Sequence, residues 1–193
     1  LYITTAVVFF IILSGKTNYI YFRKQMLRDI DEILEGNLKA TVNLIQVWIR
    51  EKTYLVNVSA ETIKNTIGDR KAVMGDLKSY KIDGDTDVMY IGYANKEMVS
   101  GDDISLPEGY DPTIRPWYVK TMEKKDVTFT EPYVDASSGN IVVSPATPFK
   151  NSAGDIIGVL AADITLNKMV EKINAIKVYN GSGYVFLLDG NGV

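Results

Sequence analysis

The sequence predicts an α+β protein in which a long N-terminal helix precedes a module built on an antiparallel sheet. Residues 16–67 contain no proline and a single glycine, and their apolar residues recur at helical spacing. The composition changes after Gly68, because all six prolines lie between Pro107 and Pro148 among runs rich in β-branched and aromatic residues. A length of 193 residues suits one domain, or one domain and part of another, with a sizeable core.

The composition excludes several functional classes. The chain has neither cysteine nor histidine, so it can form no disulfide, Cys-ligated or His-ligated metal site, or Ser-His-Asp triad. Its 21 Lys and Arg against 24 Asp and Glu give a net charge of −3, which argues against nucleic acid as a partner. No other catalytic spacing is present, and we expect no enzymatic activity, no cofactor and no metal.

Residues 1–13 form an uncharged apolar run, LYITTAVVFFIIL. The run is shorter than the roughly 20 residues that span a bilayer, so it fits either the end of a transmembrane helix that begins upstream or the core of a signal peptide. No small-residue cleavage site follows, and we therefore assign residues 1–14 to the end of a transmembrane helix. The positively charged residues at 16, 23, 24 and 28 argue that the chain continues into the cytoplasm, because positive charge tends to stay on the cytoplasmic side of a membrane. This tendency is judged by comparing the two flanks of a transmembrane helix, and these residues lie on one flank.

Residues 15–67 are predicted to form a stalk helix that dimerises. Apolar residues recur along it at helical spacing: Leu27, Ile30, Leu34, Leu38, Ile45, Trp48, Leu55, Val58, Ile63 and Ile67. A helix of this length would extend about 75 Å at 1.5 Å per residue, and helices this long are typical of stalks and dimer elements. Two stacked helices broken near Gly36 are the alternative.

Residues 68–166 are predicted to form the sheet module. Pro116 is well placed as the first residue of a short helix, because Arg115 before it is pushed into the extended region. Short turn-forming segments at 135–140 and 151–155 indicate an antiparallel meander. The strands are expected at 88–93, 127–134, 141–149 and 156–164. Residues 167–193, with a helix at 167–176 and a strand at 184–188, are expected to connect to a second module and begin it.

A cluster of donors and acceptors lies within this module. The Arg115 guanidinium offers a planar fork that matches a carboxylate, and Trp117 adds an N–H donor. Tyr133 and Asp135 are expected on one face of a strand, and Asp163 lies in an apolar run where a carboxylate is costly unless it is paired. Donors at one end and carboxylates at the other complement a zwitterion.

A purely structural role for the same residues is open. Arg115 could pair with Asp135 or Asp163, and Trp117 could be a core residue; on residue types alone this interpretation is slightly favoured. A second acidic group, Asp83, Asp85 and Asp87, has the first ligand positions of a calcium loop but lacks the later ones, so we expect a solvated turn.

The order and spacing of seven residues resemble the amino-acid-binding signature of double Cache sensor domains, the extracytoplasmic ligand-binding regions of bacterial chemoreceptors and related sensors. These residues are Tyr110, Arg115, Trp117, Tyr118, Tyr133, Asp135 and Asp163. The resemblance implies a membrane-distal PAS-like module at 68–166, and at 167–193 the start of a membrane-proximal one.

The resemblance also implies roles for these residues. Those that engage the ligand carboxylate would be Tyr110, Arg115 and Trp117. Those on the ammonium side would be Tyr118, Tyr133 and Asp163, with Asp135 part of the pattern. Tyr90 and the loop at 98–109 are expected to be walls of the pocket.

The function implied is therefore the sensor region of a transmembrane chemoreceptor that binds L-amino acids. It would be a homodimer through the long helix, anchored in a bacterial inner membrane with this region periplasmic. Alternatives are the sensor region of a histidine kinase or diguanylate cyclase, or a receptor for amines or other small molecules. A structural dimerisation or adhesion module is a further alternative from a different class.

Overall fold

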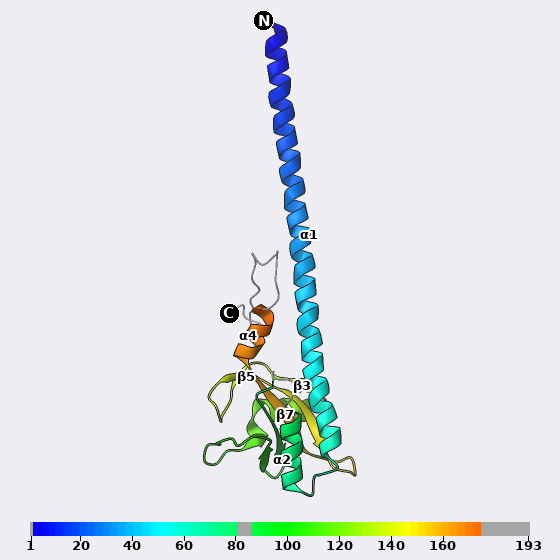
Figure 1. Cartoon of the computed structure of the whole chain (residues 1–193), viewed down its shortest axis with the longest axis vertical. Helices are drawn as coiled ribbons and strands as arrows, with labels where there is room; N and C mark the ends of the chain where they lie inside the picture. Colours follow the sequence, from blue (N-terminus) through cyan, green and yellow to red (C-terminus); the bar gives the residue numbers. More distant parts are fainter. Residues whose placement is uncertain (1, 81–85, 175–193) are drawn as a thin grey trace. The chain divides into compact units, whose positions relative to one another are not determined.

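The computed structural model describes residues 2–80 and 86–174, which fall into two compact units, 2–43 and 44–174. Helix α1 (Tyr2–Ile63) runs continuously through the apolar N-terminal segment and the predicted stalk (Figure 1). The alternative of two helices broken near Gly36 is wrong. One glycine in a helix interior costs only about 1 kcal/mol, which neighbouring helix-forming residues offset. The helix ends at Ile63, four residues before the predicted end at Ile67, and a series of turns follows it.

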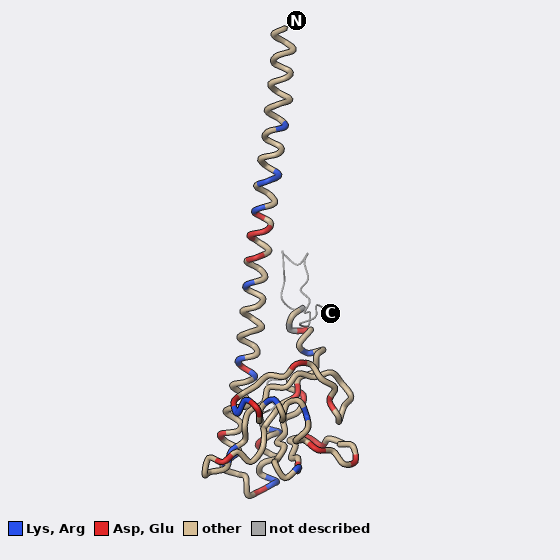
Figure 2. The backbone as a smooth tube through the Cα atoms, turned by 180° about the vertical axis from the view of Figure 1, so that it is seen from behind, with Lys and Arg blue, Asp and Glu red and all other residues tan. Residues whose placement is uncertain are grey.

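The N-terminal unit consists of the first part of α1. Among the described residues, α1 is the one helix that is long and apolar enough to cross a membrane, and none of its most apolar window is buried. Side chains such as Phe9 and Phe10 are 64% and 69% exposed. Figure 2 shows that this uncharged stretch is followed along the helix by a basic segment and then by an acidic one.

The second unit contains a seven-stranded antiparallel sheet. Its central strand is β7, which pairs with β1, β5 and β6, and the main path of the sheet is β2-β1-β7-β5-β4. The short strand β3 pairs with β6. The strands are β1 (Val88–Tyr93), β2 (Met98–Ser100), β3 (Thr128–Phe129), β4 (Tyr133–Val134), β5 (Ile141–Val143), β6 (Pro145–Lys150) and β7 (Ile156–Thr165).

The antiparallel sheet is confirmed, but two predicted strands are each divided. The prediction of single strands at 127–134 and 141–149 is wrong, since each is split in two around Thr130 and Ser144. The Ser144 N–H donates to Thr130 Oγ1 at 2.8 Å instead of to a main-chain carbonyl. Pro132 and Pro145 lie beside these breaks and lack the N–H that a continuous ladder needs.

One face of the sheet packs against helices α1 and α2 (Arg70–Ser79). Asp69 caps α2 by accepting hydrogen bonds from the N–H groups of Lys71 and Ala72 at 2.9 and 3.2 Å. The core on this face is apolar and almost fully buried, and it includes Val56, Ile63, Val73, Leu77, Met89, Ile91, Phe149 and Leu160. The Thr147 hydroxyl donates to Asn57 at 2.6 Å and ties α1 to the sheet.

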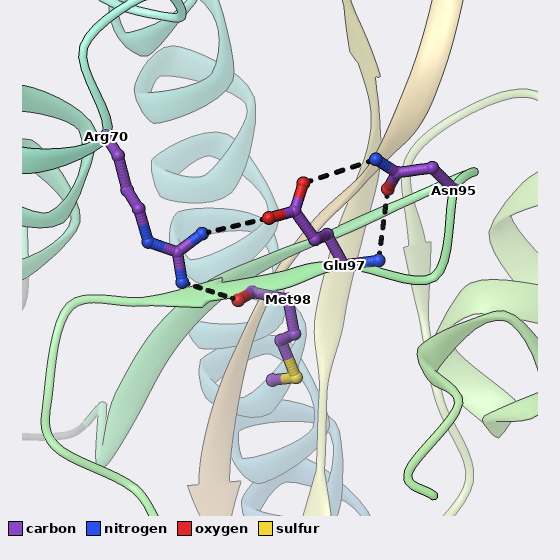
Figure 3. A network of polar contacts seen from close by, with 4 residues as sticks. All are labelled: Arg70, Asn95, Glu97 and Met98. Atoms are coloured by element: carbon purple, nitrogen blue, oxygen red, sulfur yellow. Dashed lines mark hydrogen bonds and ion pairs between the residues drawn. The ribbon is translucent and has the colours of Figure 1, made fainter.

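The start of α2 is also held to the hairpin of β1 and β2 (Figure 3). The Arg70 guanidinium lies 3.4 Å from the Glu97 carboxylate and donates to the Met98 carbonyl at 3.3 Å. Asn95 donates to the other oxygen of Glu97 at 3.2 Å. All of these groups are therefore paired with one another.

The opposite face of the sheet is covered by the 3-10 helix η1 (Pro112–Ile114) and by helix α3 (Pro116–Lys124). Because side chains alternate along a strand, Tyr90, Val159 and Ala161 point to this face. They pack against Trp117 and Tyr118 of α3. This second core contains three of the seven residues predicted to bind the ligand: Trp117, Tyr118 and Tyr133.

Helix α4 (Leu166–Asn174) follows β7 without a loop. Asp87 holds its first turn, because its carboxylate accepts from the Thr165 N–H at 2.7 Å and lies 2.7 Å from Lys168 Nζ. Asp87 is therefore engaged in an ion pair, which the expectation of a solvated turn did not include, and Asp83 and Asp85 lie outside the described residues. The predicted strand at 184–188, the end of the helix at 175–176 and the start of a second module lie outside the described residues.

Candidate functional site

The start of α3 positions the donor end of the candidate site. Arg115 has φ −79° and ψ 150°, the extended conformation expected before proline, and Pro116 is the first helical residue, as predicted. This geometry turns Trp117 and Tyr118 into the module, where they are 1% and 6% exposed. The Asp111 carboxylate caps η1 immediately upstream, accepting from the Thr113 N–H at 2.9 Å.

Arg115 forms no ion pair with an acidic residue in the part of the chain that the structure describes. Its Nη2 donates to the Val134 carbonyl at 2.7 Å, and its guanidinium carbon lies 5.7 Å from the centre of the Tyr133 ring. The structural alternative, in which Arg115 pairs with Asp135 or Asp163, is therefore not observed. The rest of its donor fork is available to an anion.

Trp117 and Tyr118 form an aromatic wall. The Trp117 ring contacts Tyr90 edge-on at a centroid distance of 5.0 Å and Tyr118 at 5.7 Å. Trp117 is therefore a core residue, as the structural alternative supposed, while also lying on the face of the site. Tyr118 packs on Trp117, and burial raises its pKa, with Asp111 contributing in the same direction.

Asp163 is the centre of the acceptor end. It is 3% exposed and lies on β7 opposite Val88 of β1. Its Oδ1 accepts three hydroxyl hydrogen bonds: from Tyr90 at 2.6 Å, Ser144 at 2.6 Å and Tyr133 at 3.1 Å. Its Oδ2 accepts none from any residue within 2–80 or 86–174, and no cation of those ranges pairs with it.

This environment shifts the ionisation of Asp163. Burial raises the pKa of the Asp163 carboxyl to about 6, although the hydroxyl donors act to lower it. The negative charge of Asp135 acts in the same direction as burial. The result is a buried carboxylate that is costly to ionise, with one oxygen left without a donor.

Asp135 does not lie on a strand, because β4 ends at Val134. The expectation that Tyr133 and Asp135 share a strand face is therefore wrong. The Asp135 Oδ2 instead accepts from the Ser137 hydroxyl at 2.7 Å and from the Ser138 N–H at 2.8 Å, within the turn that follows. Burial acts to raise the pKa of Asp135, but these hydrogen bonds hold it below its usual value.

Tyr110 lies in the loop before η1, half-buried near the charged residues of the site. Burial raises the pKa of Tyr110 to about 12, against the opposing charge of Arg115, while Asp163 and Asp135 raise it further. The structure thus brings Tyr110, Arg115, Trp117, Tyr133 and Asp163 around one region of the module. Tyr118 packs edge-on against Trp117, and Asp135 lies in the turn after β4.

Two residues of this network were missed or misjudged from the sequence. Ser144 was not predicted, although a serine inside the apolar run IVVSPATPF is a polar group in a buried strand and therefore a candidate. Tyr90 was expected only as a pocket wall, yet it donates directly to Asp163. In both cases the signal is a hydroxyl at a position where the strand is buried.

An open groove elsewhere on the module is a weaker candidate. It has a volume of about 620 Å³ and lies beside the start of α2, with apolar side chains of Ile67, Val73 and Ile157 in its lining. Its charged groups, Arg70 and Glu97, already pair with each other (Figure 3). It therefore lacks the unsatisfied polar groups that distinguish the region around Asp163.

Sequence comparisons place the chain among chemoreceptors. The family model for the methyl-accepting chemotaxis protein-like, first PDC sensor domain matches residues 53–171. The chain is 32% identical over 175 residues to the methyl-accepting chemotaxis protein McpA of Pseudomonas putida, covering 89% of this chain and 27% of McpA. It thus spans about a quarter of the length of the curated relatives that it matches.

Solved structures agree with the sequence comparisons. The ligand-binding domain of the Pseudomonas fluorescens chemoreceptor CtaA in complex with L-serine has a TM-score of 0.76 and 30% identity, with 86% of this chain and 70% of that one covered. The ligand-binding domain of the Pseudomonas aeruginosa amino acid chemoreceptor PctB in complex with L-Arg has a TM-score of 0.75 and 25% identity, with 84% and 68% covered. The predicted resemblance and the predicted α+β fold class are confirmed, and the chain belongs to the family of first PDC sensor domains of methyl-accepting chemotaxis protein-like receptors.

Proposed function

We propose that this chain is the ligand-sensing region of a transmembrane chemoreceptor and that it binds L-amino acids through both charged groups of the ligand. The observation that carries the proposal is the pair of unmet charges. Asp163 is buried with no cationic partner among the described residues, and Arg115 faces the same region without an anionic one. A zwitterion with an ammonium at one end and a carboxylate at the other would satisfy both.

We propose the following roles, which the resemblance implies and the contacts at the site support. The ligand carboxylate would bind the Arg115 guanidinium, with Trp117 and Tyr110 as further donors. The ammonium would bind Asp163, flanked by Tyr133. Tyr118 would act on the site through its packing on Trp117, and Asp135 through its charge.

The related domains of CtaA and PctB are solved with L-amino acids, which supports this ligand class. An amine without a carboxylate would leave Arg115 without an ionic partner, so an amine receptor is the weaker proposal. The relatives are receptors, which supports a non-enzymatic role.

The remaining proposals concern the long helix. We propose that the apolar N-terminal part of α1 anchors the chain in the bacterial inner membrane, with the sheet module in the periplasm. Leu27, Leu34 and Leu38 are 52%, 49% and 61% exposed at helical spacing, which supports a homodimer through this helix. Output through a chemotaxis kinase is proposed from the relatives; a histidine kinase or diguanylate cyclase output is the alternative.

Calorimetry on the detergent-solubilised chain tests the ligand class. We expect tight binding of one or more of the twenty L-amino acids, and much weaker binding of amines and organic acids, each of which leaves one charged group of the site without a partner. Arg115→Ala and Asp163→Ala should each weaken binding by about tenfold or more, since each removes a charge-assisted hydrogen bond.

Arg70→Ala is the matched control, because it removes an arginine that pairs with Glu97 away from the site. It should leave the affinity unchanged. Binding of amines alone, or an Arg115→Ala variant with the affinity of the unmodified chain, would contradict the proposal.

A further inference from the structure

The hydroxyl groups around Asp163 converge on one of its two oxygens. Tyr90 comes from β1, Tyr133 from β4, and Ser144 from the break between β5 and β6. All three hydroxyls lie within 3.1 Å of Oδ1, and the Tyr90 and Ser144 bonds measure 2.6 Å, a length typical of a hydroxyl that donates to a charged oxygen. Oδ2 accepts no hydrogen bond from the residues that the structure describes.

Ser144 is fixed for this role by its backbone. Its N–H donates to Thr130 Oγ1 at 2.8 Å, and its carbonyl accepts from the Thr130 N–H at 3.0 Å. It is fully buried, and Tyr90 is only 2% exposed. Burial also raises the pKa of Tyr90 well above its ordinary value, so its hydroxyl keeps its proton and stays a donor.

We infer, on the basis of the proposed function, that Tyr90 and Ser144 are positioning residues of the amino-acid site. Their hydroxyls hold the Asp163 carboxylate in its ionised form and fix its rotation, so that Oδ2 is the atom that receives the ligand ammonium. Both residues act through Asp163 and neither needs to touch the ligand. Neither residue belongs to the sequence signature, in which Tyr133 is the one hydroxyl donor to the same oxygen among the described residues.

The other groups that face Asp163 define the pH dependence to expect. Tyr133 donates to it from β4, Asp135 raises its pKa from the turn after β4, and Tyr110 lies within reach of its charge from the loop before η1. Because Asp163 must be ionised to bind an ammonium, affinity should fall when the pH drops through its pKa. Loss of a hydroxyl donor destabilises the ionised form and moves that midpoint upward.

The test measures affinity against pH, from 4.5 to 8, for the L-amino acid that binds the chain most tightly and for the same acid without its amino group. Ser144→Ala and Tyr90→Phe should each weaken amino-acid binding at pH 7 by about tenfold and raise the midpoint of the pH profile by about one unit. The same variants should lose much less affinity for the acid without the amino group, because that ligand has no ammonium to bind Oδ2 of Asp163.

Thr128→Val is the matched control, since it removes a buried hydroxyl that is 2.6 Å from Thr121 and does not contact Asp163. It should leave the pH midpoint unchanged. A merely structural role for Ser144 and Tyr90 would weaken both ligands equally without moving the midpoint, and that result would overturn the inference while leaving the proposed function intact. An unmodified chain that binds no L-amino acid would overturn both. Tyr90→Phe keeps the test decisive if Ser144→Ala does not fold.

Discussion

Acidification should stabilise the ligand-free protein, and Asp163 should be the cause. Burial raises the pKa of this carboxyl from 3.8 to about 6, so the folded state binds a proton more tightly than the unfolded state does. The stability that this proton contributes is fully present below about pH 3.8 and is lost as the pH rises through about 6. The corresponding free energy is about 3 kcal/mol, because one pKa unit is worth about 1.4 kcal/mol.

Most of this gain lies in a range that can be measured. About 2 kcal/mol of it should appear between pH 7 and pH 4.5 as an increase in the free energy of unfolding, measured by denaturant titration of the ligand-free chain. Asp111 and Asp135 have the opposite effect on stability, because folding lowers their pKa values below 3.8. The stability that these two carboxylates contribute is lost only as the pH falls below about 3.8. They therefore leave the window between pH 4.5 and 7 almost unaffected.

Asp163→Asn is the variant that isolates the effect. It removes the titrating group while keeping a side chain of the same shape that can accept the hydroxyls on one oxygen. Its stability should change little between pH 7 and pH 4.5. If the unmodified chain shows no gain on acidification, or if Asp163→Asn shows the same gain, the assignment of a raised pKa to Asp163 is refuted.

Three further outcomes are expected. Gly92→Ala should destabilise the fold by about 1–3 kcal/mol and weaken amino-acid binding, since a Cβ there would lie 2.6 Å from the Trp117 ring; calorimetry that shows unchanged affinity would contradict this. Asp87→Asn should speed amide hydrogen exchange in α4 by about tenfold, because it weakens the ion pair to Lys168 and the hold on the first turn, whereas unaltered exchange would count against that anchor. Phe149→Ala, in the fully buried core, should cost about 3–5 kcal/mol in denaturant titrations, and a cost below 1 kcal/mol would show that this core is not packed as described.

The fold was predictable where a local rule decides the structure. The continuous helix follows from apolar spacing and the absence of proline, and the start of α3 follows from Pro116 and the restriction that it places on Arg115. The division of strands at Thr130 and Ser144 was not predictable in the same way. It depends on a side chain replacing a main-chain acceptor across the sheet, which no single segment of sequence encodes.

The candidate site was predictable in its residue types but not in its connections. The signature correctly brought Arg115, Tyr133 and Asp163 into one region, and Asp135 was misplaced because the end of a two-residue strand cannot be located from alternation alone. Ser144 was missed because its importance arises from a contact 19 residues away along the chain. Which of these residues bind a ligand stays a prediction that the calorimetry above addresses.

The direct junction between β7 and α4 couples the position of Asp163 to the start of the helix. Asp163 is the eighth of the ten residues of β7, and the helix begins right after the strand ends. Asp87, whose N–H donates to the Asp163 carbonyl, also holds the first turn of α4. Only two residues therefore separate Asp163 from the first residue of α4, and Asp87 holds the backbone at both ends of this segment. A displacement of Asp163 would therefore be transmitted to the start of α4 through the hydrogen bond and the ion pair that Asp87 makes.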